Sequence, residues 1–421
     1  MIIAAKTCQL CALVLENIGD LSKVGYIYRR LLSRTLEQAG SYETDCLVFG
    51  RSNEAQKEEN PLSIGLFVLE DSPLAKQDLV LGRQLNPVEN NPIILEWIDK
   101  CVRWHEKCSY SESDDRDFKP PTRLLDLGVN GSSTIHLRNG HDCLGRYATL
   151  SHCWGKSPST TTTRATLSSR MNGFNTSILC RTMRDAVAIT RSIRIQYLWI
   201  DALCIVQDDY EDWAREAVTM AQVYTQSFIT IAASSSADGD GGCFQSLPST
   251  PSATLKWTLN YSTKPEKVQF RKSNTNRFRD AVLNGPLNRR AWVLQERSLS
   301  PRILSYTNDG LFWECEDAIR MDGNAPIENY LLWDIPKVKG FKLSTSRLTE
   351  TDSKHWRYHE EWMDLIVRYT ACQLTNESDR LPALSGLAKV WAGGICIPVR
   401  SRSHGRSFAC RTAVGEERTP R

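Results

Sequence analysis

The sequence predicts an α/β fold: a βαβ core with a mostly parallel sheet, a mixed α+β N-terminal region and a C-terminal helix. Three short apolar segments, residues 147–153, 197–206 and 228–233, are expected to be buried strands. Two amphipathic segments of helical periodicity separate them, and strands that alternate with such helices form parallel sheets. The chain of 421 residues, 41% of them hydrophobic, is long enough for one large domain or several packed units.

The N-terminal region mixes helical and strand-like patterns. A helix is predicted over residues 24–39, followed by short apolar strands at 46–49 and 64–69. A second helix is predicted over residues 93–108. The region closes with a polar linker and then two short strands around an Asn-Gly turn, at residues 111–121, 123–129 and 134–137.

The predicted core takes its boundaries from capping residues and apolar runs. Thr182, followed three residues later by an acidic residue, has the spacing of a capping box and predicts the start of the first helix. Residues 197–206 are almost continuously apolar, which is typical of a strand buried on both faces. The second helix is predicted over residues 210–226, with Asp208 or Asp209 as its cap.

The segments after the core have three different characters. Residues 250–285 are polar and predict a hairpin insertion, whereas strong apolar content returns at 287–315 and a final helix is expected at 354–374. Six Arg and few apolar residues lie between Pro398 and Arg421, which predicts disorder. Four regions are expected: a mixed N-terminal region, the core, a β-rich closure with the final helix, and a disordered basic tail, at residues 1–146, 147–297, 298–396 and 397–421.

Composition excludes several classes of function. The 52 Lys and Arg against 49 Asp and Glu give 52 − 49 = +3, which is too balanced to predict nucleic-acid binding. The apolar start is interrupted by Lys6 and lacks the layout of a secretory signal. No apolar stretch reaches the roughly 18 residues that a membrane-spanning helix needs. We therefore expect a cytoplasmic protein whose 14 Cys are mostly reduced thiols or metal ligands.

Five Cys and His residues predict a metal site in the N-terminal region. Cys8 and Cys11 form a C-x-x-C pair, and Cys101, His105 and Cys108 are spaced to share one face of a helix. Thiolate and imidazole ligands suit tetrahedral zinc, so four of these five residues could bind it. The alternative is that Cys101 and Cys108 are small apolar core residues.

Three segments in order resemble the heterokaryon-incompatibility (HET) domain of filamentous fungi. They read Tyr-Ala-Thr-Leu-Ser-His-Cys-Trp-Gly at 147–155, Leu-Trp-Ile-Asp-Ala-Leu-Cys-Ile-Val-Gln-Asp at 198–208, and Arg-Ala-Trp-Val-Leu-Gln-Glu at 290–296. His152 departs from the family pattern, which more often has an aromatic residue there. The resemblance implies a role in non-self recognition that triggers programmed cell death, through protein partners or self-association. A remote likeness of the family to TIR-type domains implies NAD as a substrate.

Asp201 is the first candidate for a catalytic residue, because it is the one carboxylate within an apolar segment. A buried carboxylate is unfavourable unless it is paired or hydrogen-bonded, and ligands of parallel sheets bind beyond the carboxyl ends of the strands. The functional interpretation is a polar group in a site at that edge. The alternative is a structural role, either as a backbone cap or in an ion pair with Arg184 or Arg290.

Glu296 and Ser151 complete the candidate catalytic set. Glu296 follows an apolar run and could stabilise positive charge on a departing ribosyl group. Ser151, Asp201 and Glu296 are predicted to face one cleft. A triad of Ser151, His152 and Cys153 is not expected, because neighbours on a strand point to opposite faces. The alternative for Glu296 is an ion pair with one of three arginines, Arg289, Arg290 or Arg302.

Three functions are therefore carried forward. The first is a HET-type signalling protein that triggers cell death, the second is an NAD-cleaving enzyme that uses the carboxylates, and the third is a zinc-supported regulatory scaffold. No glycine-rich phosphate loop follows any predicted strand, so nucleotide binding through such a loop is not expected.

Overall fold

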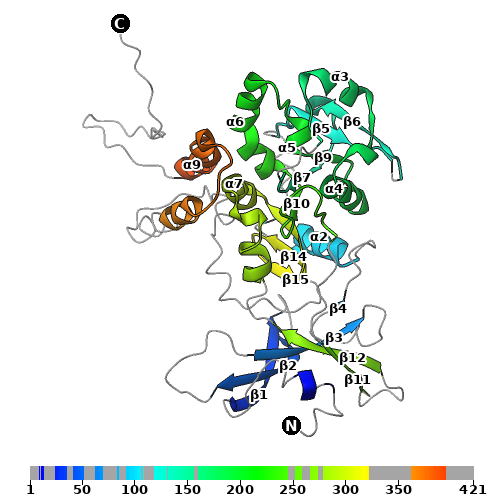
Figure 1. The fold of residues 1–421 in the computed structure, drawn as a ribbon, viewed down its shortest axis with the longest axis vertical. Coiled ribbons are helices and arrows are strands. Elements are labelled where there is room, and N and C mark those ends of the chain that lie inside the picture. The colour runs from blue at the N-terminus through cyan, green and yellow to red at the C-terminus, as the bar shows by residue number, and fades with distance from the viewer. Residues whose placement is uncertain are drawn as a thin grey trace, which may run out of the picture.

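The computed structural model describes two sheets and the helices that cover the larger one (Figure 1). The structure describes residues 9, 11–13, 24–35, 41–51, 62–69, 83–84, 92–105, 108, 118–129, 131–155, 160–244, 252–257, 266–273, 278–321 and 362–394. The expected tail at 397–421 and the linker at 111–117 lie outside these residues. Among the described residues, no helix is both long and apolar enough to cross a bilayer.

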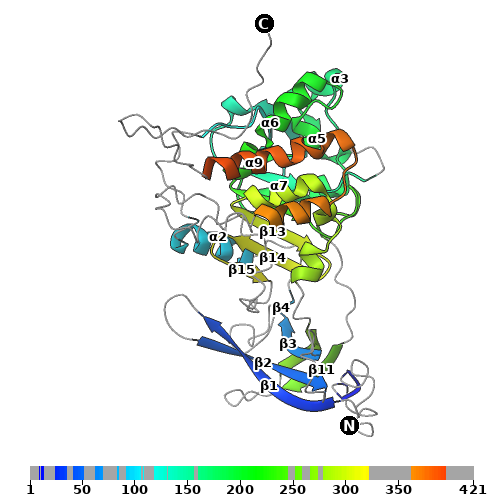
Figure 2. The ribbon, with the colours of Figure 1, turned by 90° about the vertical axis from the view of Figure 1, so that its left-hand side faces the viewer.

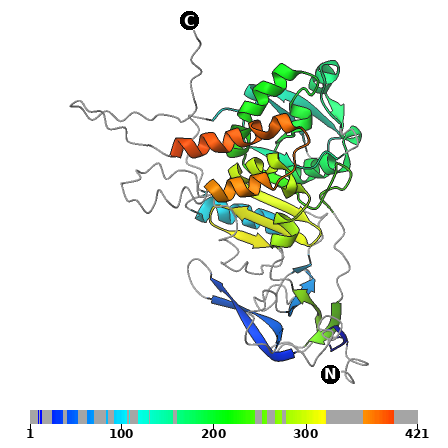
Figure 3. The same cartoon turned by 60° about the vertical axis from the view of Figure 1, so that its left-hand side comes forward.

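A six-stranded sheet is built from the N-terminal region and from the insertion of the core. Its strands follow the order β1-β2-β3-β12-β11, and β4 pairs with β3. Figure 3 shows this sheet, in blue and yellow-green, apart from the rest of the described chain. The insertion is the expected hairpin, since β11 and β12 pair antiparallel. The strands are Val24–Thr35 (β1), Ser41–Arg51 (β2), Leu62–Leu69 (β3), Arg83–Gln84 (β4), Ser252–Trp257 (β11) and Glu266–Ser273 (β12).

The helix predicted over residues 24–39 was wrong, because residues 24–35 form β1. This segment contains Val24, Tyr26, Ile27 and Tyr28, residue types that fit a pleated strand. Its partner β2 runs antiparallel to it along almost its whole length, so tertiary pairing decides the conformation. The strands expected at 46–49 and 64–69 are present as parts of β2 and β3.

The second sheet has nine strands and contains the predicted parallel core. Its order is β15-β14-β13-β10-β7-β9-β5-β6-β8. The four central strands β13, β10, β7 and β9 are parallel, and the flanking strands are antiparallel. The strands are Arg123–Asp126 (β5), Thr134–Asn139 (β6), Tyr147–Ser151 (β7), Phe174–Asn175 (β8), Tyr197–Trp199 (β9), Ile229–Ala233 (β10), Arg302–Thr307 (β13), Gly310–Cys315 (β14) and Ile319–Met321 (β15).

The helices follow the expected order, and several of their boundaries differ from the prediction. The segment 197–206 is not one strand, because β9 ends at Trp199 and a short helix begins at Asp201. Thr182 is not the helix cap, since Cys180 holds that position. Asp209 does cap the second helix through its carboxylate. The helices are Pro92–Trp104 (α2), Arg164–Asn172 (α3), Arg181–Ser192 (α4), Asp201–Cys204 (α5), Tyr210–Gln226 (α6), Ala291–Leu299 (α7) and Pro382–Gly394 (α9).

Alternate residues of the central strands face opposite sides of the large sheet. Ile231 and Leu304 belong to the larger apolar cluster, to which α2 and α4 also contribute. Ala232 and Ile303 instead pack with Val293 of α7 in a separate cluster. Helices α6, α7 and α9 contact one another, and Figure 2 shows α7 and α9 lying over the sheet. The parallel strands are thus covered on both faces, as their near-continuous apolar sequences require.

Candidate functional site

The carboxyl ends of β7, β9 and β10 lie at the point where the strand order reverses. The chain passes from β7 to β9 on one side and then back to β10 on the other side of β7. Ligands of open parallel sheets bind beyond such a reversal. Here the loops after β7 and β10 meet closely, because a Cβ added to Gly155 would collide with the Cβ of Asp238. Gly155 also has a φ of +77°, so the turn after β7 depends on glycine.

Asp201 lies directly after β9 and makes local hydrogen bonds. Its carboxylate accepts hydrogen bonds from the backbone N–H of Ala202 at 2.8 Å and from the indole N–H of Trp154 at 3.0 Å. Arg184 and Arg290 instead donate to the backbone carbonyl oxygens of Leu179 and His152. Among the described residues, Asp201 forms no ion pair with either arginine. It is also not the cap of α5, because the N-cap is Ile200 and the only backbone N–H that donates to the Asp201 carboxylate is that of the next residue.

His152 is buried beside Asp201. Its Nδ1 lies 3.9 Å from the Asp201 carboxylate, and neither ring nitrogen has a hydrogen-bond partner among the described residues. Burial lowers the pKa of His152, so the ring is neutral at physiological pH.

Ser151 and Glu296 are in direct contact. Ser151, the last residue of β7, donates a hydrogen bond of 2.5 Å from its hydroxyl to the Glu296 carboxylate on α7. Burial raises the pKa of Glu296 to about 7, against the opposing effects of Ser151, Arg290 and the Tyr224 hydroxyl. None of the three arginines proposed as alternatives forms an ion pair with Glu296 among the described residues. A carboxyl group with a pKa near 7 can exchange a proton at neutral pH.

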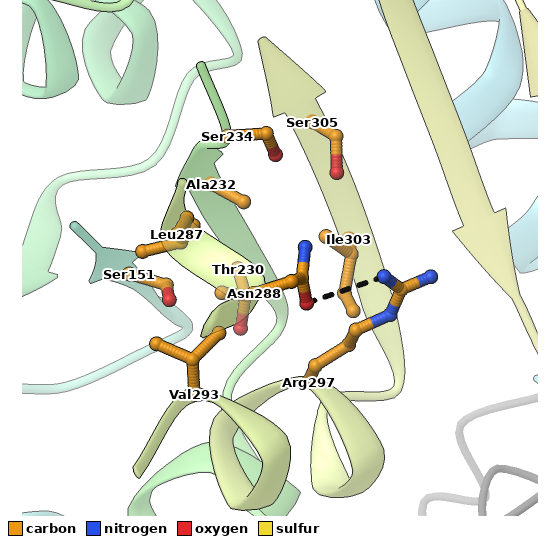
Figure 4. A pocket seen from close by; sticks show the side chains of 10 residues that line it. All are labelled: Ser151, Thr230, Ala232, Ser234, Leu287, Asn288, Val293, Arg297, Ile303 and Ser305. Carbon is orange, nitrogen blue, oxygen red and sulfur yellow. Dashed lines mark hydrogen bonds between the residues drawn. The ribbon is translucent and has the colours of Figure 1, made fainter. Parts of the chain in front are cut away.

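A small pocket lies between the sheet and α7, and it reaches from the strands β10 and β13 to Ser234, the first residue after β10. Figure 4 shows Ser234, Ser305, Thr230 and Asn288 projecting into the same space as Ser151. The buried hydroxyl of Ser234 has no hydrogen-bond partner among the described residues. The remaining lining residues are apolar apart from Arg297, namely Ala232, Leu287, Val293 and Ile303.

The three predicted catalytic residues are brought together only in part. Ser151 contacts Glu296 and lines the pocket, but neither Asp201 nor Glu296 is among its lining residues. Cys153 packs with Ala232 in the cluster under α7, on the same side as Ser151, whereas His152 points toward Asp201. This alternation agrees with the argument against a triad of consecutive residues. One cleft shared by all three candidates stays a prediction.

A second cluster of side chains, called the metal group below, could hold a metal ion. The side chains of Cys101, His105, Cys108 and Cys315 are all buried, and their ligand atoms lie within 4.8 Å of one another. Hydrogen bonds from the Cys101 and Cys108 thiols lower the pKa of the Cys315 thiol. At Cys315 this shift favours the thiolate, the form that binds metals, whereas the corresponding hydrogen bonds raise the pKa of the Cys108 thiol.

The metal group contains three of the five predicted ligands. Cys11 is half-buried and is not part of the group, and Cys8 lies outside the described residues. The fourth member is Cys315, at the end of β14, which sequence reasoning missed. A single cysteine in an apolar strand gives no spacing signal, so only the packing of β14 against the segment after α2 shows its role.

The three resembling segments build most of the site at the strand ends. They supply β7 with Ser151, the β9–α5 junction with Asp201, and α7 with Glu296. Residues 147–296 match the family model described as heterokaryon incompatibility protein (HET). The chain carries a HET domain. No curated protein and no solved structure was found to match the chain.

The large sheet extends beyond the matched HET domain on both sides. The domain supplies β7 to β10, including the parallel strands β7, β9 and β10. The fourth parallel strand, β13, and the antiparallel strands β14 and β15 follow the match, whereas β5 and β6 precede it. The segments that flank the HET domain therefore complete its sheet.

Proposed function

We propose that this chain is a HET-type signalling protein of filamentous fungi, in which non-self recognition leads the HET domain to trigger programmed cell death. The match of residues 147–296 to the family carries this proposal. Each of the three resembling segments carries one candidate polar residue, Ser151, Asp201 or Glu296, and Ser151 and Glu296 are in contact, which supports a common site at the strand ends. Recognition is expected to occur through protein partners or self-association in the cytoplasm.

NAD cleavage is kept as a second activity for this domain, because Glu296 is a buried carboxyl with a pKa of about 7 in contact with Ser151. A group of this kind could balance the positive charge of a departing ribosyl group. No family match bears on NAD, so the two activities are separated by experiment.

Induced expression of the full chain in yeast is expected to kill the cells. Viability and cellular NAD would be followed for the native chain and for Asp201→Ala and Glu296→Ala at equal protein levels. A fall in NAD with the native chain alone supports catalysis by the carboxylates. Death with unchanged NAD in all three supports signalling by association. Glu211→Ala, at an exposed carboxylate of α6, is the matched control. Normal growth with full-length folded protein would contradict the proposal of cell death.

The metal group supports a further part of the proposal, a zinc-supported scaffold. Three thiols and one imidazole are the ligands of structural zinc, whereas magnesium and calcium prefer oxygen. The full chain purified under reducing conditions without chelators is expected to contain about one zinc per molecule. Metal analysis checks this, and a chain that neither retains nor takes up Zn²⁺ would contradict it.

A further inference from the structure

The metal group joins two parts of the chain that are far apart in sequence. His105 and Cys315 are 210 residues apart, yet the His105 Nδ1 lies 3.2 Å from the Cys315 Sγ. Cys101, His105 and Cys108 precede the matched HET domain, and Cys315 follows it. Figures 1 and 2 both show α2 beside the strands β14 and β15. In the sequence, the whole HET domain therefore lies between the first three residues of the metal group and the fourth.

Tight backbone turns present the ligand atoms on both sides. Helix α2 ends at Trp104, but the backbone N–H of Cys108 donates to the His105 carbonyl at 3.0 Å and continues the turn. On the other side, the backbone N–H of Cys315 donates to the Ala318 carbonyl at 2.9 Å. Ligand atoms around a tetrahedral zinc lie about 3.3–3.8 Å apart, as the metal–ligand bond lengths dictate. The four ligand atoms lie within 4.8 Å of one another, so small shifts would bring them to these separations.

Arg302 gives an independent indication of negative charge in this group. It is a fully buried residue of β13, and no carboxylate lies within 4.0 Å of its guanidinium among the described residues. The guanidinium instead donates to the Cys101 Sγ at 3.3 Å, to the Cys108 carbonyl at 2.7 Å and to the Phe228 carbonyl at 3.2 Å. A buried cation requires a counter-charge.

Three thiolates and a neutral imidazole around Zn²⁺ carry a net charge of −1, since three negative charges exceed the two positive charges of the ion. This is the counter-charge that Arg302 lacks among carboxylates. Metal ligands are also commonly oriented by hydrogen bonds from neighbouring groups, as Arg302 donates to the Cys101 sulfur here. Zinc binding would therefore give the three thiolates a ligand role and would balance the charge of the buried arginine.

We propose that one Zn²⁺, held by Cys101, His105, Cys108 and Cys315, is a clasp that fastens the segment before the HET domain to the strands after it. This inference rests on the proposed zinc binding and adds its mechanical role. Closing a loop of this length removes conformational freedom from the unfolded chain. The clasp also holds α2 against β14, where Trp97 and Trp313 pack with ring centroids 6.3 Å apart.

Hydrogen–deuterium exchange of the full chain, with zinc bound and after removal by a chelator, tests the clasp. Removal is expected to increase exchange together in α2 and in β13 to β15, with little change in α6. Re-addition of Zn²⁺ is expected to restore the protection. Cys315→Ser is expected to lose most of the bound zinc and to show the exchange pattern of the chelated chain. Cys315→His, which keeps a zinc ligand, is expected to retain the metal.

Two further variants make the outcomes distinguishable. Cys11→Ser removes a thiol outside the group, and Cys204→Ser places a hydroxyl at another fully buried cysteine; both are expected to keep one zinc. If the native chain binds no zinc, the zinc proposal fails and the clasp fails with it. If Cys315→Ser keeps its zinc, or if zinc removal leaves α2 and β14 equally protected, the clasp alone is overturned. If Cys315→Ser does not fold, the chelation experiment on the native chain decides.

Discussion

Replacing Arg123 with alanine is expected to lower the free energy of unfolding by roughly 3–5 kcal/mol, the cost of leaving a buried charge unpaired. Arg123 lies at the start of β5 and contacts Asp212 at 2.5 Å and Glu216 at 3.5 Å, with all three side chains at most 10% exposed. Its guanidinium also donates to the Cys204 carbonyl at 2.6 Å. The alanine variant would bury two carboxylates without this cation.

The loss of unfolding free energy in the Arg123→Ala variant should be smaller at low pH. Burial raises the pKa of Glu216, and Arg123 opposes that rise. Without the arginine, protonation of the carboxylates at low pH relieves part of the cost, so the deficit at pH 5 is expected to be smaller than at pH 8. Arg215→Ala is the matched control, because Arg215 contacts the same Asp212 at 3.1 Å but is 65% exposed. Its cost should stay below about 1 kcal/mol. Equal losses in urea unfolding for both variants would contradict the prediction.

Glu296→Gln is expected to stabilise the fold at neutral and alkaline pH. The folded-state pKa of Glu296 is about 7, above the ordinary value of 4.5 for a glutamate, because the carboxylate is buried. The native chain therefore loses stability as pH rises from about 4.5 through 7, where the buried group must ionise. Glutamine keeps the shape and can still accept the hydrogen bond from Ser151, but it does not ionise.

Unfolding in urea at a series of pH values checks this. The stability of Glu296→Gln relative to the native chain should rise by on the order of 3 kcal/mol between pH 5 and pH 8. Glu377→Gln, at a glutamate whose side chain is 91% exposed, should show no such rise. A relative stability that does not change with pH would mean that Glu296 is ionised throughout and that its environment compensates the charge.

Local patterns predicted the elements whose sequence periodicity and caps agree with their final environment. The strand β7, helix α6 with its Asp209 cap and strand β10 all follow from apolar runs and one capping residue. Parallel pairing followed from the same alternation of strands and helices, and β7 does pair in parallel with β9 and β10. The alternation of Ser151 and His152 across the sheet followed from strand geometry alone.

The errors arose where contacts with other parts of the chain decide the conformation of a segment. The segment at 24–35 is a strand because β2 pairs with it, and neither strand shows its partner in its own sequence. The apolar segment at 197–206 changes from strand to helix at Asp201, just beyond the carboxyl end of β9. There the Asp201 carboxylate accepts hydrogen bonds from the N–H groups of Ala202 and Trp154. An unbroken apolar run does not mark such an edge, since buried strands and short buried helices have the same composition.

The sequence by itself determined the βαβ order, the three family segments and three of the four residues of the metal group. Each of these depends on spacings within one helix or one short segment, which the chain carries locally. Only the tertiary structure decided that Cys315 joins Cys101, His105 and Cys108, that Glu296 meets Ser151, and that the flanking strands complete the sheet. Ser151 and Glu296 are separated by 145 positions and His105 and Cys315 by 210, so sheet pairing and core packing, and not local propensity, set these distances.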